Sequence, residues 1–239
     1  DALPISIAAR REFLDALRGR TVRTVVNTHH HEDHAGNNSA LASLCAPLIL
    51  AHTKALPWIA EPSRMPLRAY QLAVWKRHDG SSAQSVGSTV ETENHSFKVV
   101  FTPGHSFDHI SLYEPDRKWL FTGDLFCGRK IKYFRRDEDY GLLLESIEKL
   151  AGLDVETIFC GLLGVVRDGG KMLADKAAFM AKLRDDAREL SAAGLSPRAI
   201  ARRLMGREGA MYYLTGGHYA KVNAVRSVLA GGPVDPWPI

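Results

Sequence analysis

The stretch Thr28-His29-His30-His31-Glu32-Asp33-His34-Ala35-Gly36 contains four of the ten histidines of this 239-residue chain. In an extended segment alternate side chains share a face, so His29 and His31 can point the same way. A bend after them can bring Asp33 and His34 to a second point nearby. Imidazoles and carboxylates are the ligands that Zn²⁺ and Fe²⁺ favour in catalytic sites. The run is neither repetitive nor terminal, as a purification tag would be, and it therefore predicts a metal centre.

Two later motifs each place one metal-competent side chain after a predicted strand. These motifs are Thr102-Pro103-Gly104-His105-Ser106 and Phe121-Thr122-Gly123-Asp124. In α/β folds the loops that follow strands often form the active site. Each motif is a weak signal alone. Together with the histidine run, and in this order along the chain, they predict that His105 and Asp124 join the same site.

The composition excludes several classes of protein. Hydrophobic residues make up 45% and charged residues 24% of the chain, as in ordinary soluble domains. The net charge of +4 is dispersed, without a basic stripe interleaved with aromatic residues, so we expect no nucleic-acid partner. No apolar run is long enough to span a bilayer, so we expect no membrane partner. The three cysteines, Cys45, Cys127 and Cys160, are isolated, which argues against a disulfide framework or a thiolate zinc site.

Apolar periodicity and turn residues predict an α/β arrangement up to about residue 170. We expect strands at 21–28, 48–51, 97–102, 110–114, 118–122 and 156–160, and helices at 6–17, 38–44, 65–76 and 140–150. After Gly169-Gly170 the pattern becomes wholly helical, with helices expected at 171–193, 197–205 and 220–229. The sequence thus predicts two parts, residues 1–170 and a helical C-terminal extension at 171–239.

The combined motifs resemble the metallo-β-lactamase superfamily, and the histidine run is most similar to that of its glyoxalase II branch. The resemblance runs from residue 1 to about 170. It implies an αββα sandwich with the metal site at one edge. It also places Asp1 where the family ends its second strand. We therefore expect the family's first strands to be missing from this chain, together with any N-terminal targeting signal, and we expect a cytoplasmic protein.

The resemblance also implies a ligand set. The first metal would be bound by His29, His31 and His105. The second would be bound by Asp33 and His34, with Asp124 bridging both. Asp33 and Asp124 would also act in catalysis, by orienting the nucleophile and moving a proton. The expected cofactor is one or two Zn²⁺ ions, with Fe²⁺ or Mn²⁺ as alternatives.

One position departs from the family pattern. The family's fifth motif is a Gly-His pair after a late strand, and here the matching residues are Gly161-Leu162. Leucine cannot bind a metal, so the second site lacks one expected nitrogen. Cys160 or His218 could replace it only if the fold brings them to the site. A single tightly bound metal is therefore expected.

The resemblance implies metal-dependent hydrolysis of an ester, thioester, lactone, amide or phosphoester by a metal-bound hydroxide. Two alternatives stay open: a mononuclear iron oxygenase of the persulfide dioxygenase type, and a catalytically impaired relative in which Leu162 has removed activity.

The expected partner is a small-molecule substrate, and the helical extension could mediate homo-oligomer formation. His109 could orient a ligand or lie at the surface, and Glu32 is expected in solvent. The remaining candidates are expected to be ordinary surface, core or rim residues: His52, His78, His95, Arg129, Lys130, Lys132, Tyr133, Tyr212 and Tyr213.

Overall fold

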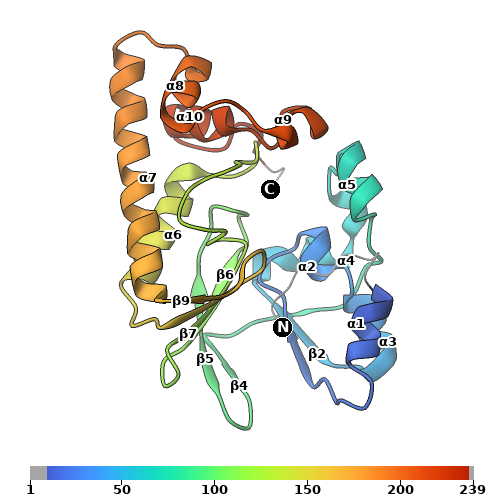
Figure 1. The fold of residues 1–239 in the computed structure, drawn as a ribbon. Coiled ribbons are helices and arrows are strands. Elements are labelled where there is room, and N and C mark those ends of the chain that lie inside the picture. Colours follow the sequence, from blue (N-terminus) through green and yellow to red (C-terminus); the bar gives the residue numbers. More distant parts are fainter. Residues whose placement is uncertain (1–9, 237–239) are drawn as a thin grey trace.

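The computed structural model describes residues 10–236 and shows two β-sheets between layers of helices. Figure 1 shows α6 and α7 beside the larger sheet and α1 and α3 beside the smaller one. Residues of both sheets line the space between them, including Val26 of the smaller sheet and Phe97 and Leu112 of the larger. The layers therefore follow the order helix, sheet, sheet, helix.

The smaller sheet is parallel, with the strand order β1-β2-β3. Its strands are β1 (Thr24–Val26), β2 (Leu48–Ala51) and β3 (Gln84–Ser85). Parallel strands need crossover connections, and short helices supply them here. These are α2 (Glu32–Ala35), α3 (Asn38–Cys45), α4 (Leu56–Ala60) and α5 (Ala69–Val74), with single 3₁₀ turns at Thr53–Ala55 and Pro62–Arg64. Helix α1 (Arg10–Ala16) precedes the first strand.

The larger sheet has six strands in sequence order, and only the β7–β8 pair is parallel. The strands are β4 (Thr89–Glu91), β5 (Ser96–Phe101), β6 (Ile110–Glu114), β7 (Trp119–Gly123), β8 (Thr157–Cys160) and β9 (Gly164–Arg167). The crossover between β7 and β8 contains α6 (Tyr140–Ala151). Asp139 caps this helix by accepting a hydrogen bond from the amide of Leu142 at 2.9 Å. Helix α6 then buries Leu143, Ile147 and Leu150 on one face.

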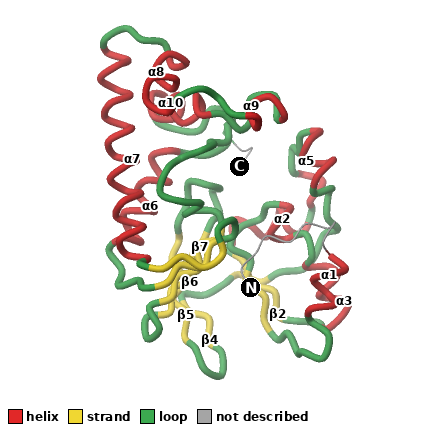
Figure 2. The backbone as a smooth tube through the Cα atoms, viewed as in Figure 1, coloured by secondary structure: helices red, strands yellow, loops and turns green. Residues whose placement is uncertain are grey.

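The helical extension packs on α6 and shares one hydrophobic core with it and the larger sheet. It consists of α7 (Gly169–Ala192), α8 (Pro197–Met205), α9 (Ala210–Leu214) and α10 (Lys221–Ala230), as the path of the tube in Figure 2 shows. Leu173, Met180 and Leu183 of α7 are buried in this core. None of the helices within residues 10–236 combines the length and apolar character needed to cross a membrane. The predicted division at residue 170 stays a prediction.

Most expected elements are present, and the differences have physical reasons. Strands 48–51 and 110–114 have the predicted bounds, and β1 is shorter than the predicted strand at 21–28. The helix expected at 38–44 is α3, and a further short helix, α2, starts within the histidine run. The missed strands β3, β4 and β9 have two to four residues each and carry too little periodicity to detect. Residues 1–9 lie outside the described part of the chain, and so does the expectation about Asp1.

Candidate metal centre

The histidine run leaves β1 and is anchored to both sheets. The amide of Asn27 donates to the carbonyl of Leu50 at 2.8 Å, so the run begins while the chain still pairs with β2. The Asn38 side chain donates to Asn27 Oδ1 at 2.8 Å and ties this segment to α3. The amide of Ile110 in β6 donates to the carbonyl of Thr28 at 2.8 Å. These contacts fix the backbone just before the first histidine.

His105 and Asp124 reach the same edge from the larger sheet. His105 lies in the turn after β5, and Asp124 directly follows β7. Gly104 has a φ of +132°, and a Cβ atom there would lie 2.3 Å from the backbone nitrogen of Leu143. The turn that carries His105 therefore requires glycine, because it packs directly on the start of α6.

His29, His31 and His105 form one potential ligand group. One nitrogen from each ring lies within 4.8 Å of the other two, and His105 Nε2 is 3.1 Å from His31 Nδ1. All three side chains are buried. Three imidazoles converging on one point match the donor set of catalytic zinc sites that keep a position open for substrate.

Neighbouring side chains determine which ring nitrogens face this point. Thr28 Oγ1 lies 3.0 Å from His29 Nδ1, and Glu138 Oε1 lies 2.7 Å from His105 Nδ1. The Nε2 atoms of His29 and His105 are therefore left for the site. His29 Nε2 is buried without a hydrogen-bond partner among the described residues. A buried polar atom normally has a partner, so these residues fit a bound divalent metal.

Asp124 lies between the first group and a second one. Its Oδ1 is 3.4 Å from His34 Nε2, and its Oδ2 is 3.8 Å from His105 Nε2. His29, His34 and Asp124 form the second group whose ligand atoms lie within 4.8 Å of one another. A carboxylate with one oxygen towards each group is placed as a bridging ligand would be. The bridging role of Asp124 nevertheless stays a prediction.

Asp33 lies near His34 and Asp124, with which its carboxylate interacts electrostatically. It is half-buried on α2 and belongs to neither ligand group within the described residues. Burial, together with the carboxylate of Asp124, raises the pKa of Asp33. The carboxylates are thus close enough to interact. Both predicted roles of Asp33, in metal binding and in catalysis, stay predictions.

The electrostatics favour neutral imidazoles in the first group. Burial, followed by the nearby His34, lowers the pKa of His29 well below its ordinary value. Burial and the guanidinium of Arg135 do the same to His31. Metal ligation requires the neutral ring, so these histidines need not lose a proton to bind a metal at neutral pH.

His34 and Asp124 behave as an ion pair in the protein alone. Burial opposes charge on His34, but the carboxylates of Asp124 and Asp33 outweigh it and raise the pKa of His34 to about 9. Burial likewise opposes ionisation of Asp124, yet the interaction with His34 holds its pKa below the usual range. A second metal must therefore displace a proton from His34, whereas the first group binds without this cost.

Leu162 is located at the tip of the β8–β9 hairpin. The turn at 161–163 joins strands that pair Cys160 with Gly164, and the amide of Gly161 donates to the carbonyl of Gly123 at 3.1 Å. The tip thus lies next to the Asp124 turn, where the fifth motif was expected. The Leu162 side chain is 65% exposed and offers no ligand atom.

The two residues considered as replacements do not join the ligand groups. Neither Cys160 nor His218 belongs to a cluster of potential ligands among residues 10–236. His218 instead contacts Tyr70, with 2.5 Å between the phenol oxygen and His218 Nδ1. His109 is fully buried beside His29, with 5.1 Å between ring centroids, so of its two alternatives the position close to the site is the one observed.

Sequence reasoning missed Glu138 and Arg135 and misplaced Glu32. Glu138 and Arg135 are buried against the histidines, but they lie in the charged run 135–139, which by pattern alone indicates a solvated surface. Glu32 was expected in solvent. It is 2% exposed, and its Oε1 accepts a hydrogen bond from Gln71 of α5 at 2.8 Å. That expectation was wrong because α5 folds back over α2.

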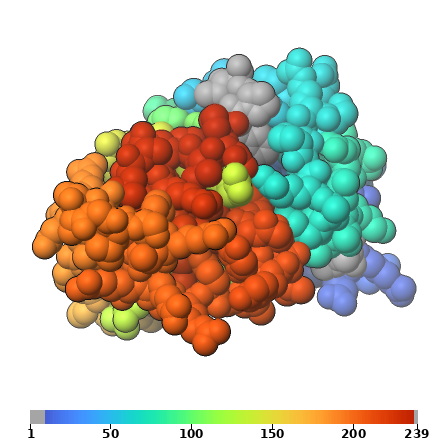
Figure 3. Space-filling model, turned by 90° about the horizontal axis from the view of Figure 1, so that it is seen from above, coloured from blue at the N-terminus to red at the C-terminus, as the bar shows by residue number. Residues whose placement is uncertain are grey.

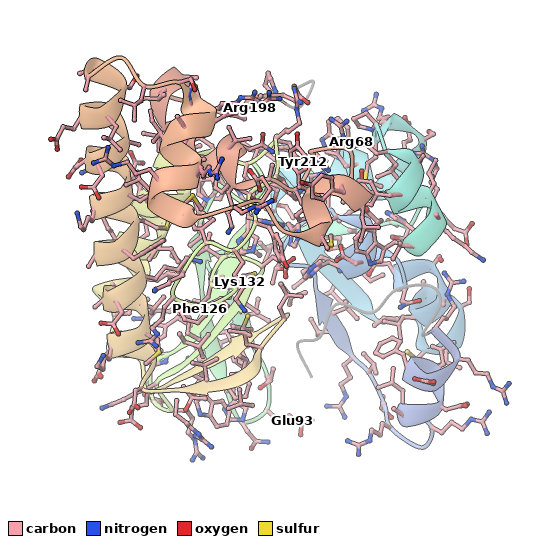
Figure 4. The ribbon with its side chains drawn as sticks, turned by 45° about the horizontal axis from the view of Figure 1, so that its top comes forward. Arg68, Glu93, Phe126, Lys132, Arg198 and Tyr212 are labelled. Carbon is pink, nitrogen blue, oxygen red and sulfur yellow. The ribbon has the colours of Figure 1, made fainter. Side chains whose placement is uncertain are left out.

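The other candidates lie away from the ligand groups or at the surface. Arg129, Lys130, Lys132, Tyr133 and Tyr213 are exposed, whereas Tyr212 is half-buried. Figure 4 labels Lys132 in the loop below the helical extension, with Tyr212 and Arg68 above it. His52 stacks on Phe101 with 4.6 Å between centroids, His95 is half-buried, and His78 is buried rather than exposed.

We predict that Glu138→Gln weakens zinc binding by about 10- to 100-fold, the usual effect of losing a carboxylate that orients a ligating histidine. Glutamine preserves the shape but removes the charge beside His105 Nδ1. Competitive titration with a chromogenic chelator measures the affinity. Glu145→Gln, on the exposed face of α6, is the matched control. Wild-type affinity in Glu138→Gln would contradict the assigned role.

A second prediction concerns the pH dependence of stability in the metal-free protein. Burial, reinforced by His105, lowers the pKa of His109 from 6.5 to about 3. Below pH 6.5 the unfolded chain takes up a proton that the folded chain does not, so stability falls as the pH drops from about 6.5 towards 3. At pH 5.5 this residue should account for a loss of about 1.4 kcal/mol.

Urea unfolding of EDTA-treated protein between pH 5 and 7.5 tests this prediction. His109→Asn keeps a polar atom near Thr102 Oγ1, which lies 3.0 Å from His109 Nδ1, but it cannot take up a proton. His109→Asn should lack the part of the pH dependence that comes from His109, even if its free energy of unfolding is lower than that of the wild type at every pH. His95→Asn is the control. Identical pH profiles for wild type and His109→Asn would show that another group carries the effect.

Curated relatives match the part of the chain that contains the site. The hydroxyacylglutathione hydrolase of Legionella pneumophila (strain Corby) is 34% identical over 113 residues, covering 46% of this chain and 37% of its own length. The protein of the same name from Crocosphaera subtropica is 33% identical over 154 residues, covering 62% of this chain and 52% of its own. The chain therefore spans only about a third to a half of the relatives that it matches.

Solved structures share the fold of this chain. A β-lactamase domain protein from Burkholderia ambifaria superposes with a TM-score of 0.73 at 17% identity, covering 97% of this chain and 76% of its own. A metallo-β-lactamase family protein from Thermus thermophilus gives 0.69 at 18%, covering 97% and 83%. A third structure, described as a di-iron-bound form, gives 0.54 at 24%, covering 70% and 83%. These likenesses confirm the predicted fold, and the two structures that cover 97% of this chain include the helical extension.

A sequence profile of the metallo-β-lactamase superfamily matches residues 4–162. The match covers well over half of the chain and includes the histidine run and the motifs with His105 and Asp124. It ends at Leu162, the position of the departure described above. This protein belongs to the metallo-β-lactamase superfamily.

Proposed function

We propose that this protein is a metal-dependent hydrolase whose reaction takes place at His29, His31, His105 and Asp124. The observation that carries the proposal is the convergence of three buried imidazoles beside an ionised carboxylate. Membership of the superfamily and the hydrolase relatives support it. The ligand roles are proposed together with the function, with zinc as the favoured ion and iron or manganese as alternatives.

Each of these residues has a role that its contacts support. A divalent metal bound here would lower the pKa of a coordinated water towards about 7 and polarise the bond under attack. Thr28 and Glu138 hold the His29 and His105 rings in place through their Nδ1 atoms. Asp124, ionised at neutral pH, can accept a hydrogen bond from the attacking water and so orient it.

We further propose a thioester as the first substrate class to examine. Two relatives at 33–34% identity are hydroxyacylglutathione hydrolases, and a hydroxyacylglutathione is a thioester. They match this chain over only part of their length, so an ester, lactone, amide or phosphoester is tested beside it. The substrate is a small molecule in each case. Self-association through the helical extension stays a prediction.

The second metal position is weaker in this proposal than the first. It has His34 and Asp124 but no fifth-motif imidazole, and its His34 is protonated in the protein alone. We therefore propose hydrolysis with one tightly held metal. The iron oxygenase and the impaired relative are outcomes of the same experiment rather than separate proposals.

The test uses protein stripped with EDTA and reloaded separately with Zn²⁺, Mn²⁺ or Fe²⁺. S-lactoylglutathione, p-nitrophenyl acetate, a γ-lactone, a p-nitroanilide and p-nitrophenyl phosphate represent the thioester, ester, lactone, amide and phosphoester classes. We expect metal-dependent hydrolysis of at least one, and a loss of about 100-fold or more in kcat for Asp124→Asn. Asp116→Asn, in the exposed β6–β7 turn, is the control.

Two results would reject the hydrolase. The oxygenase would be supported if only the iron-loaded protein consumed oxygen with glutathione persulfide and no form of the protein hydrolysed any substrate. No turnover with any metal or substrate class would support the impaired relative. Full activity in Asp124→Asn would remove this carboxylate from the mechanism.

A further inference from the structure

Arg135 lies in the loop between β7 and α6, and its backbone is held on two sides. It forms an isolated antiparallel bridge with Tyr219 of the helical extension. Its amide donates to Glu138 Oε2 at 2.8 Å. The next contact along the extension, from the amide of Ala220 to the carbonyl of Phe134, measures 3.0 Å. In Figure 3 the extension, in orange and red, borders the cyan segment that contains α5.

The guanidinium of Arg135 is buried, and its nitrogens have different partners. Arg135 is 5% exposed. Nε donates to Asp137 Oδ1 at 2.9 Å and Nη2 donates to Asp137 Oδ2 at 2.7 Å. Nη1 instead lies 3.4 Å from His31 Nδ1. Asp137 thus holds one edge of the guanidinium while the third nitrogen points at the histidine cluster.

The position of Nη1 matters because of what else lies beside His31 Nδ1. This nitrogen is 3.1 Å from His105 Nε2, so it is the atom of His31 that we place in the proposed ligand group. An imidazole nitrogen has one lone pair, so once it binds a metal it cannot also accept a hydrogen bond from Nη1. A buried charged donor without an acceptor is costly. Nη1 would then be available to donate to an oxygen atom at the metal centre.

A network from the helical extension keeps the guanidinium in this direction. His218 Nε2 lies 3.3 Å from Asp137 Oδ1, and the Tyr70 hydroxyl lies 2.5 Å from His218 Nδ1. Burial lowers the pKa of His218, so the ring is neutral, accepts from Tyr70 and donates to Asp137. Such a preorganised donor is the kind of group that stabilises charge developing in a transition state.

We propose that Arg135 is a catalytic residue that binds, through Nη1, the substrate oxygen on which negative charge develops. This role rests on the proposed hydrolase function. In this role Arg135 would place a fixed, charged guanidinium beside the one tightly held metal that we propose. Arginine suits the task because its planar fork can bind Asp137 with two nitrogens and an oxyanion with the third.

Binding of inorganic phosphate, a tetrahedral oxyanion, tests the role without turnover. Zinc-loaded wild type, Arg135→Met and Arg136→Met are titrated with phosphate by calorimetry, and their zinc contents are measured. Arg136 is the matched control, because it forms an equivalent pair with Asp235, at 2.7 and 3.1 Å. We expect Arg135→Met to bind phosphate about 10- to 100-fold more weakly with unchanged zinc content, and Arg136→Met to behave as wild type.

Kinetics on the best substrate provide the second readout. Removing a donor to the developing charge should lower kcat by about 10²- to 10³-fold with a much smaller change in KM. Wild-type phosphate affinity or wild-type kcat in zinc-loaded Arg135→Met would overturn the proposal. If no substrate class is hydrolysed, the proposed function fails, and the phosphate comparison still decides the role of Arg135.

Arg135→Lys covers the case in which Arg135→Met does not fold or loses zinc. Lysine keeps the charge but has a single nitrogen, so it cannot bind Asp137 and the oxyanion as the fork does. Phosphate affinity and kcat should both fall at least several-fold. Wild-type values in Arg135→Lys would overturn the proposal just as they would in Arg135→Met.

Discussion

The hydrogen bond between Glu138 and His105, 2.7 Å long and buried, joins the parts of this protein on which the candidate centre depends. Glu138 directs His105 Nε2 towards the rings that arrive from the smaller sheet. Its second oxygen holds the amide of Arg135. One carboxylate therefore orients a proposed metal ligand and the loop that carries the guanidinium. Because both contacts are buried, water cannot replace them without cost.

The helical extension takes part in this arrangement. Asn223, fully buried at the start of α10, donates to the carbonyls of Phe134 and His218, and His218 contacts Asp137. Through these contacts the extension holds the loop between β7 and α6 in place. These contacts link the described part of the extension to a sandwich whose proposed ligands all come from residues before 125. The profile match ends before the extension, whereas the solved structures with the same fold include it.

The sequence predicted the parts of the centre that depend on local spacing. His29 and His31 share a face of an extended segment, and His105 and Asp124 follow strands, so motif order was sufficient to bring them together. Glu138 and Arg135 could not be predicted, because their burial results from the packing of α10 and α6 around a charged loop. The burial of Glu32 was not predicted for a related reason, because its partner in α5, Gln71, lies 39 positions further along the chain. In the fold, the long amphipathic helices were predictable, whereas the short strands β3, β4 and β9 were not, because they carry too little periodicity.

This chain follows the motif pattern of the metallo-β-lactamase superfamily except at position 162, where leucine replaces the histidine of the fifth motif. We propose that three histidines hold one metal tightly, while the position beside His34 and Asp124 is incomplete. Elemental analysis of zinc-loaded, dialysed wild type and Leu162→His tests it most directly. We expect about one zinc per chain in the wild type and a rise towards two in Leu162→His, because an imidazole beside His34 and Asp124 completes the second site. Two tightly held zinc ions in the wild type, or no zinc at all, would contradict it.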